Sequence, residues 1–165
     1  MKVLVTVASK HGATAEIGDR IAAELARRGH DVTNRPPEEV GRVEGFDAVV
    51  IGSAVYAGRW RPEARDLIDE FGRYLRDRHL WLFSSGPLGE PPEPNEDPID
   101  IAAIVEATSP HPHRMFPGKL DPEVLGLAER AIVRALRAPY GDFRDWEEIT
   151  AWAGEIADAL DAATA

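Results

Sequence analysis

Three nearly continuous apolar segments, separated by stretches with helical periodicity, constrain the fold of this chain more than any other feature. The segments are Lys2–Ala8, Asp47–Ser53 and His79–Ser85. Because they are rich in β-branched and aromatic residues, they are typical of parallel strands that are covered on both faces. Asp31–Arg35 and His113–Gly118 are weaker and have the pattern of edge strands. Pro117 suits such an edge, because it cannot donate a ladder hydrogen bond.

Apolar stripes with helical spacing lie between these segments. They comprise Ile17, Ile21 and Leu25; Ala64, Leu67, Ile68, Phe71 and Leu75; Ile101, Ile104 and Val105; and Ile149, Trp152, Ala153, Ile156 and Leu160. Asp121 before Pro122 predicts one further helix start, and Asp145 with Glu148 predicts a capping box. Strands that alternate with helices predict an α/β fold. We expect one three-layer domain over residues 1–165, with five parallel strands in the order 2-1-3-4-5.

The composition narrows the chemistry that the chain can perform. No cysteine is present among the 165 residues, so disulfides, thiolate nucleophiles and iron–sulfur clusters are excluded, and redox chemistry would need a bound organic cofactor. The formal net charge of −10 argues against nucleic acid as a partner. No apolar run approaches the roughly 20 residues that cross a bilayer, and the N-terminal run is too short for a secretory signal. We therefore expect a cytoplasmic location and, at most, peripheral contact with a membrane.

Three loops are expected at the ligand-binding edge of such a sheet, because ligands bind beyond the carboxyl ends of the strands where the strand order reverses. The loops are Ser9–Thr14, Ser53–Trp60 and Ser84–Gly89. In the first, the amides of Gly12, Ala13 and Thr14 would converge at the N-terminus of a helix. Hydroxyls of Ser9 and Thr14 would complete the cage. Since the Gly-Lys-Ser/Thr element of a Walker loop is missing, the pattern predicts a site for a phosphate monoester.

The same loops resemble those of the flavodoxin family. Flavodoxins hold the phosphate of FMN in a Thr/Ser-x-Thr/Ser-Gly-x-Thr loop, and "SKHGAT" matches at Ser9, Gly12 and Thr14. His11 replaces the middle hydroxyl and either contacts the phosphate or faces water. In "GSAVYAG", Tyr56 stands where the family has an aromatic residue that stacks on the flavin ring, and "SSGPLG" falls at the third flavin loop. The resemblance implies a flavodoxin-like α/β/α sandwich that binds FMN. The implied contact residues are Ser9, Lys10, His11, Gly12, Ala13, Thr14, Ser53, Ala54, Val55, Tyr56, Ala57, Gly58, Trp60, Ser84, Ser85, Gly86, Pro87, Leu88 and Gly89.

A closer likeness is to the flavodoxin-like branch that contains the bacterial quinone-linked protoporphyrinogen dehydrogenases. Gly58 with Trp60, "FPGKLDP" and the C-terminal "GDFRDWEEITAWAGEIA" match that branch, whereas its long basic and aromatic insertion is not evident. The resemblance leaves three functions open. The chain is an electron carrier between a reductase and an acceptor enzyme, a flavoenzyme that oxidises a flat substrate such as a porphyrinogen and reduces a quinone, or a flavin-free binding module.

Three further features lie outside these loops. Apolar residues between Val124 and Leu136 exceed one helical stripe, and we expect them to pack in the core, with a dimer or membrane contact as the alternatives. The proline-rich, acidic segment Gly89–Asp100 is expected to be a solvated loop, and the alternative is that it steers a basic redox partner. His111 and His113 are expected to be polar residues that enter an edge strand rather than metal ligands.

Overall fold

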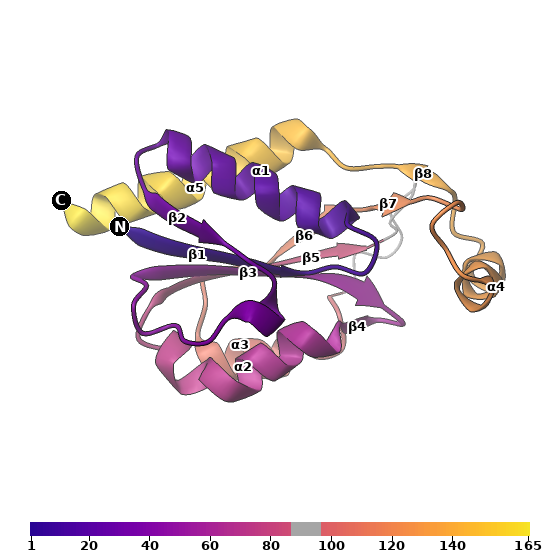
Figure 1. Cartoon of the computed structure of the whole chain (residues 1–165), viewed down its shortest axis with the longest axis horizontal. Coiled ribbons are helices and arrows are strands. Elements are labelled where there is room, and N and C mark those ends of the chain that lie inside the picture. The colour runs from indigo at the N-terminus through magenta and orange to yellow at the C-terminus, as the bar shows by residue number, and fades with distance from the viewer. Residues whose placement is uncertain (87–96) are drawn as a thin grey trace.

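The computed structural model describes residues 1–86 and 97–165, and Figure 1 shows how its helices and strands are arranged. In chain order the elements are β1 (Lys2–Ala8), α1 (Ala13–Arg27), β2 (Asp31–Asn34), the 3-10 helix η1 (Pro37–Glu39), β3 (Ala48–Tyr56), β4 (Arg59–Trp60), α2 (Pro62–Leu75), β5 (His79–Gly86), α3 (Ile101–Thr108), β6 (Arg114–Pro117), β7 (Lys119–Leu120), α4 (Leu127–Leu136), β8 (Gly141–Asp142) and α5 (Trp146–Thr164).

Five parallel strands form the sheet in the order β2-β1-β3-β5-β6. In the central register, Val3 pairs with both Val32 and Ala48, and Val49 pairs with Leu80. This is the predicted order 2-1-3-4-5, and the α/β class is confirmed with it. Two short pairings were not predicted: β4 folds back antiparallel onto the end of β3, and β7 pairs with β8.

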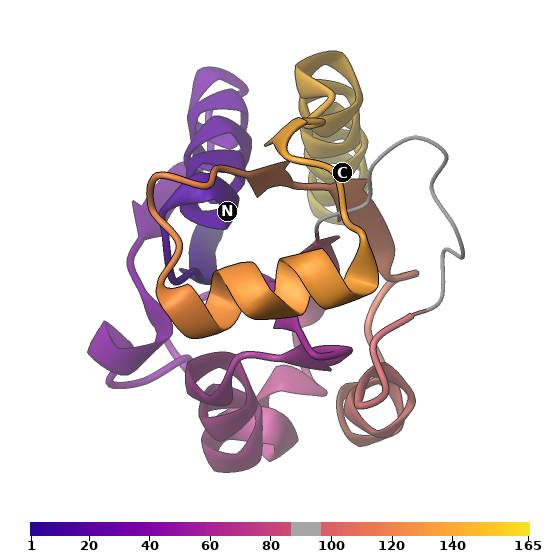
Figure 2. The same ribbon diagram turned by 90° about the vertical axis from the view of Figure 1, so that its right-hand side faces the viewer.

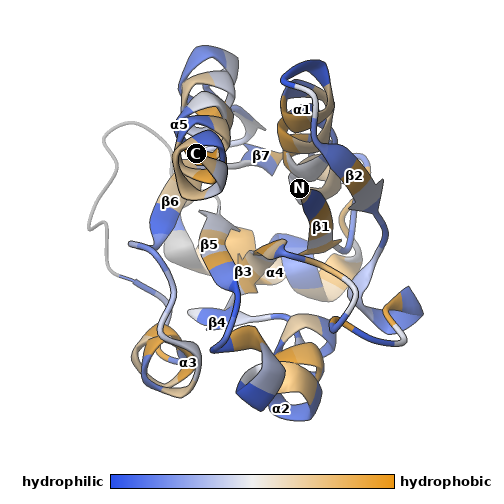
Figure 3. Cartoon of the chain, turned by 90° about the vertical axis from the view of Figure 1, so that its left-hand side faces the viewer, coloured by the Kyte–Doolittle hydropathy of each residue, from blue (hydrophilic) through white to orange (hydrophobic). Residues whose placement is uncertain are grey.

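Helices α1 and α5 cover one face of the sheet, and α2 and α3 cover the other (Figure 1). Their apolar stripes face the strands (Figure 3). Each central strand contributes to two buried clusters, because successive side chains point to opposite faces. In β1, for example, Val5 packs in the cluster under α1 and α5, and Leu4 packs in the cluster over α2. This two-sided burial is what the continuous apolar runs predict.

Most of the predicted strand boundaries are confirmed to within one residue. β1 begins and ends at the predicted residues, and β5 extends only one residue beyond Ser85. The edge strands β2 and β6 are short and only partly buried, as their weaker patterns predict. β3 continues to Tyr56 instead of ending at Ser53, because its last residues pair with β4. The second predicted loop is therefore largely a β-hairpin.

The segment after β7 differs most from its predicted structure. The helix expected to start at Asp121 begins at Leu127, since the Asp121 carboxylate accepts a hydrogen bond from the Glu123 amide at 2.9 Å and closes a turn. The prediction that this segment packs in the core is also wrong. Leu125 is buried, but Leu127 is 86% exposed and Ile132 is 54% exposed. Instead, α4 crosses the edge of the sheet at which the parallel strands end (Figure 2). Within the described ranges, no helix is long and apolar enough to cross a membrane.

The predicted cap of the last helix is confirmed. Asp145 is the N-cap of α5, and its Oδ1 accepts a hydrogen bond from the Glu148 amide at 3.1 Å. We expect Asp145→Ala to lower the free energy of unfolding, measured by urea denaturation, by about 1 kcal/mol. Asp69→Ala, on the exposed face of α2, is the matched control and should change it far less. Equal losses in the two variants would show that the cap contributes nothing.

Candidate binding site

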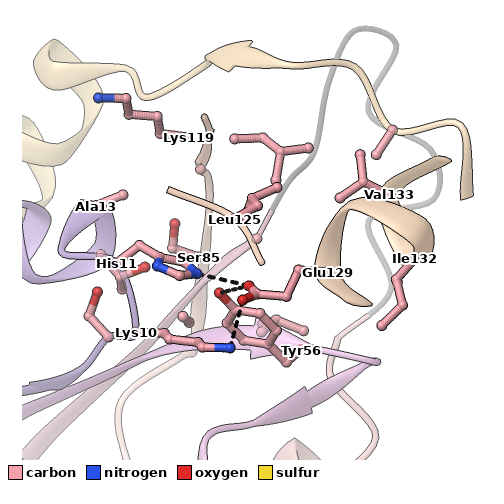
Figure 4. Close-up of a pocket in the computed structure, with 18 of the residues that line it drawn as sticks. Lys10, His11, Ala13, Tyr56, Ser85, Lys119, Leu125, Glu129, Ile132 and Val133 are labelled. Atoms are coloured by element: carbon pink, nitrogen blue, oxygen red, sulfur yellow. Dashed lines mark hydrogen bonds and ion pairs between the residues drawn. The ribbon is translucent and has the colours of Figure 1, made fainter. Parts of the chain in front are cut away.

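A pocket opens at the carboxyl edge of the sheet, beneath α4 (Figure 4). Eleven of the predicted site residues line it: Ser9, Lys10, His11, Ala13, Thr14, Ala54, Val55, Tyr56, Ala57, Ser85 and Gly86. They come from all three predicted loops. The sheet topology therefore brings together segments that lie far apart in the chain, as the reversal of strand order predicts.

The β1–α1 loop ends at the uncapped N-terminus of α1. Gly12 occupies the N-cap position with a φ of 89°, a left-handed conformation that glycine adopts readily. Its amide donates to Ser9 Oγ at 3.1 Å, and Gly12 does not line the pocket, so its contact with a phosphate stays a prediction. The amides of Ala13 and Thr14 and the Thr14 hydroxyl make no hydrogen bond to any residue in the described ranges. These donors, together with the helix dipole, make this end of the pocket suited to an anion.

Tyr56 forms the wall of the pocket at the end of β3. Its ring is partly buried, and the cations Lys10 Nζ and Arg61 Cζ lie 5.7 and 5.6 Å from its centroid. Burial raises the pKa of the Tyr56 hydroxyl, and the nearby negative charge of Glu129 raises it further. The side chain is thus a neutral aromatic surface at neutral pH.

Not all of the predicted residues in the described ranges line the pocket. Five of these described residues lie outside it, namely Gly12, Ser53, Gly58, Trp60 and Ser84. Pro87, Leu88 and Gly89 fall outside the described residues, as does most of the acidic segment Gly89–Asp100. Ser53 is fully buried, where its Oγ donates to the Ala54 carbonyl at 2.8 Å and accepts from the Arg61 amide at 2.9 Å. Its hydroxyl therefore holds the β3–β4 hairpin together.

Trp60 points into the core rather than into the pocket. It is 1% exposed, and its indole Nε1 donates to Ser84 Oγ at 2.6 Å. Ser84 Oγ lies 2.7 Å from His113 Nε2, and His113 Nδ1 lies 3.2 Å from a carboxylate oxygen of Asp97. His113 thus links the buried Ser84 hydroxyl to the exposed Asp97, and burial of the imidazole lowers its pKa. His111 stacks on Trp81 at 4.2 Å between ring centroids.

Two segments that line the pocket were not predicted to do so. One is the turn from β6 to β7, which contributes Gly118, Lys119 and Leu120. The other is the region of α4, which contributes Leu125, Glu129, Ile132, Val133 and Ala138. The first lies within the quoted "FPGKLDP". The sequence contains no signal for the second, because its apolar residues predict packing in the core.

Glu129 connects α4 to the β1–α1 loop. Its carboxylate accepts a hydrogen bond from Lys10 Nζ at 2.7 Å and lies 2.8 Å from His11 Nε2 (Figure 4). The Tyr56 hydroxyl is 3.5 Å away from the same carboxylate. The hydrogen bonds from Lys10 and His11 lower the pKa of Glu129 to about 2. The carboxylate is therefore ionised throughout the neutral range.

This pKa can be measured directly. We expect the carboxyl carbon of Glu129, followed by NMR, to titrate at a pH of about 2. Because the pKa in the folded protein is depressed, the interaction stabilises the fold above the ordinary glutamate pKa and is lost as the pH falls towards about 2. Lys10→Met should move the pKa of Glu129 upward, since the largest cause of its depression is removed. An unchanged pKa in that variant would contradict the pairing.

Arg144 supports the same loop from the other side. It is 5% exposed, and its guanidinium donates to the Ala13 carbonyl at 3.0 Å and to Glu16 at 2.8 Å. It also forms an ion pair with Asp142 at 2.8 Å and stacks on Trp146. These contacts fix the first turn of α1, from which the unpaired amides project.

A family model for the flavodoxin domain matches residues 4–146. The chain belongs to the flavodoxin family. Among its relatives is protoporphyrinogen IX dehydrogenase [quinone] of Escherichia coli K12. The two are 24% identical in an alignment that is 179 residues long, gaps included, and covers 99% of each chain. Flavodoxin-family membership implies a flavin cofactor and a role in electron transfer.

Solved flavodoxins share the fold of this family member. An archaeal flavodoxin aligns with a TM-score of 0.65 at 16% identity, covering 98% of this chain and 99% of that one. Oxidised flavodoxin 1 from Bacillus cereus aligns with a TM-score of 0.66 at 13% identity, covering 96% and 98%. At these identities the likeness shows the common architecture, and the site must be argued from the residues of this chain.

Proposed function

We propose that this flavodoxin-family chain binds FMN in the pocket and uses it to carry electrons between redox proteins. One observation carries the proposal: unpaired donors at the start of α1 and the partly buried ring of Tyr56 face the same cavity. An anion site beside an aromatic wall suits a molecule with a phosphate at one end and a flat ring at the other.

The residues at the anion end fit a phosphate monoester. The amides of Ala13 and Thr14 and the Thr14 hydroxyl would donate to its oxygens, and the Ser9 hydroxyl, whose oxygen already accepts from Gly12, keeps its proton to donate. Lys10 would supply a positive charge at the rim. This set of compact donors resembles other phosphate sites at helix N-termini.

The wall beside the anion end fits a flat ring. Tyr56 would stack on it, which is worth about 0.5–1.5 kcal/mol beyond burial. Gly118 lies in the same wall, where a Cβ would come within 2.6 Å of the Gly86 carbonyl oxygen, so glycine at this position lets the turn after β6 lie close against β5. Leu125 and Val133 would exclude water from this part of the pocket.

Bound FMN would supply reversible exchange of a hydride or of single electrons, and the residues above would bind and orient it. No side chain of the chain needs to act as an acid or a base in this role. The partners of a carrier would be a reductase and an acceptor enzyme.

A second candidate function is favoured by the position of α4. The helix crosses the carboxyl edge of the sheet (Figure 2), and Ile132 and Val133 give the pocket beneath it an apolar lining (Figure 4). Such a lining suits a flat organic substrate better than a protein surface. The chain would then be a flavoenzyme of the type of its Escherichia coli relative, with a porphyrinogen as the donor and a quinone as the acceptor.

Anaerobic reduction of the FMN-loaded protein distinguishes the two. For a carrier, we expect fast reduction by a flavodoxin reductase protein with NADPH and no turnover with protoporphyrinogen IX plus menadione. Repeated turnover of protoporphyrinogen, with no exchange with the reductase, would contradict the carrier and support the enzyme.

A further inference from the structure

Glu129 contacts two side chains that would also bind a phosphate in the pocket. Its two carboxylate oxygens lie 2.7 Å from Lys10 Nζ and 2.8 Å from His11 Nε2. Both partners belong to the loop that carries the unpaired amides of Ala13 and Thr14. A carboxylate from a distant helix thus sits at the mouth of the anion site (Figure 4).

The helix that carries Glu129 has little else to hold it there. No described side chain of α4 is buried, and Leu127 and Ile132 are largely exposed. Arg130 donates only to the nearby Pro122 carbonyl. Within the described ranges, Glu129 therefore makes all the polar side-chain contacts between α4 and the body of the protein.

A phosphate dianion and the Glu129 carboxylate cannot both be well placed at Lys10 and His11. Like charges at such short range repel each other, and each hydrogen bond that Lys10 gives to one anion is lost to the other. The bond to Glu129 is charge-assisted and only partly exposed to solvent, so displacing it costs binding energy.

We propose that Glu129 is an internal competitor for the anion site, so that α4 is latched over the empty pocket and is released when a phosphate binds. The proposal rests on the proposed FMN site, and it adds a specificity-determining residue to it. The latch lowers the affinity for phosphorylated flavin and couples opening of the pocket mouth to occupation of the β1–α1 loop. The opposite role, in which Glu129 orients Lys10 and His11 towards the phosphate, predicts effects of the opposite sign.

Titration of flavin-free protein with FMN and with riboflavin, followed by flavin fluorescence, separates the two roles. We expect Glu129→Gln to bind FMN about tenfold more tightly than the natural chain, as expected for the loss of one competing charge-assisted bond. Riboflavin, which lacks the phosphate, should gain much less affinity from the substitution. The matched control is Glu123→Gln, which removes the same charge from an exposed position and should leave both affinities unchanged. Weaker or unchanged FMN binding by Glu129→Gln, or an equal gain for riboflavin, would overturn the proposal.

Hydrogen exchange tests the latch without any flavin. In flavin-free protein, amides of residues 127–136 should exchange faster in Glu129→Gln than in the natural chain or in Glu123→Gln. Saturating inorganic phosphate should speed exchange in the natural chain and leave Glu129→Gln unchanged. If neither the natural chain nor Glu129→Gln binds FMN, the proposed function fails. Hydrogen exchange still tests whether Glu129 holds α4 in place. Exchange in α4 that responds neither to the substitution nor to phosphate would overturn it.

Discussion

Gly52→Ala is expected to lower the free energy of unfolding by about 3 kcal/mol, at the upper end of the range for overpacked cores. Gly52 lies in β3 and pairs with Phe83 of β5, and a Cβ on Gly52 would collide with three atoms of the Phe83 ring. That ring cannot move aside easily. It is fully buried, and its centroid lies 5.9 Å from those of both Phe116 and Trp152 in edge-to-face contacts.

A glycine-to-alanine substitution elsewhere in the chain should change the free energy of unfolding in the opposite direction. A Cβ on Gly72, inside α2, would meet no atom within 4 Å. Gly72→Ala should therefore raise the free energy of unfolding by about 0.5–1 kcal/mol, because alanine favours the helix. Urea denaturation of the two variants measures both changes. A loss in Gly52→Ala no larger than that of an ordinary surface substitution, about 0.5 kcal/mol, would contradict the packing described for Phe83.

Thr14→Val is expected to weaken FMN binding by about 10- to 150-fold, since a hydrogen bond to a charged group contributes about 1.5–3 kcal/mol. Thr14 lines the pocket in the first turn of α1 and is 5% exposed, and valine matches its shape. Fluorescence titration with FMN measures the affinity. Riboflavin should bind equally to the variant and the natural chain, because the lost hydroxyl would contact only the phosphate.

Thr33→Val on the edge strand β2 is the matched control for this experiment. It makes the same chemical change away from the pocket, so FMN affinity should not change. If Thr14→Val lost affinity for riboflavin and FMN alike, the phosphate would have to be placed elsewhere.

The sheet could be predicted from the sequence because its signals are local. The alternation of apolar runs and helical stripes predicts which segments are strands and which are helices that cover them, and Asp145 caps α5 through a residue only three positions away. Positions of glycine were harder to interpret. Gly52 fits the flavodoxin loop pattern, yet the structure gives it a packing role against Phe83, which is distant in sequence.

The position of α4 over the pocket could not be predicted, because it depends on long-range contacts. Asp121 before Pro122 is compatible with a helix start or with a turn, and the structure forms a turn. The apolar residues of α4 predict burial, but the helix is placed by the pairing of Glu129 with Lys10 and His11. Trp60 likewise points into the core, because its indole donates a hydrogen bond to Ser84. The sequence does not indicate this contact.

The central claim is that donors at the start of α1 hold the phosphate of a flavin mononucleotide. Titration of the purified, flavin-free protein with FMN and with riboflavin tests it most directly. We predict that FMN fluorescence is quenched to an end point of one FMN per chain, with clearly weaker binding of riboflavin. A colourless protein that quenches neither flavin would contradict the account and leave a flavin-free binding module on this fold.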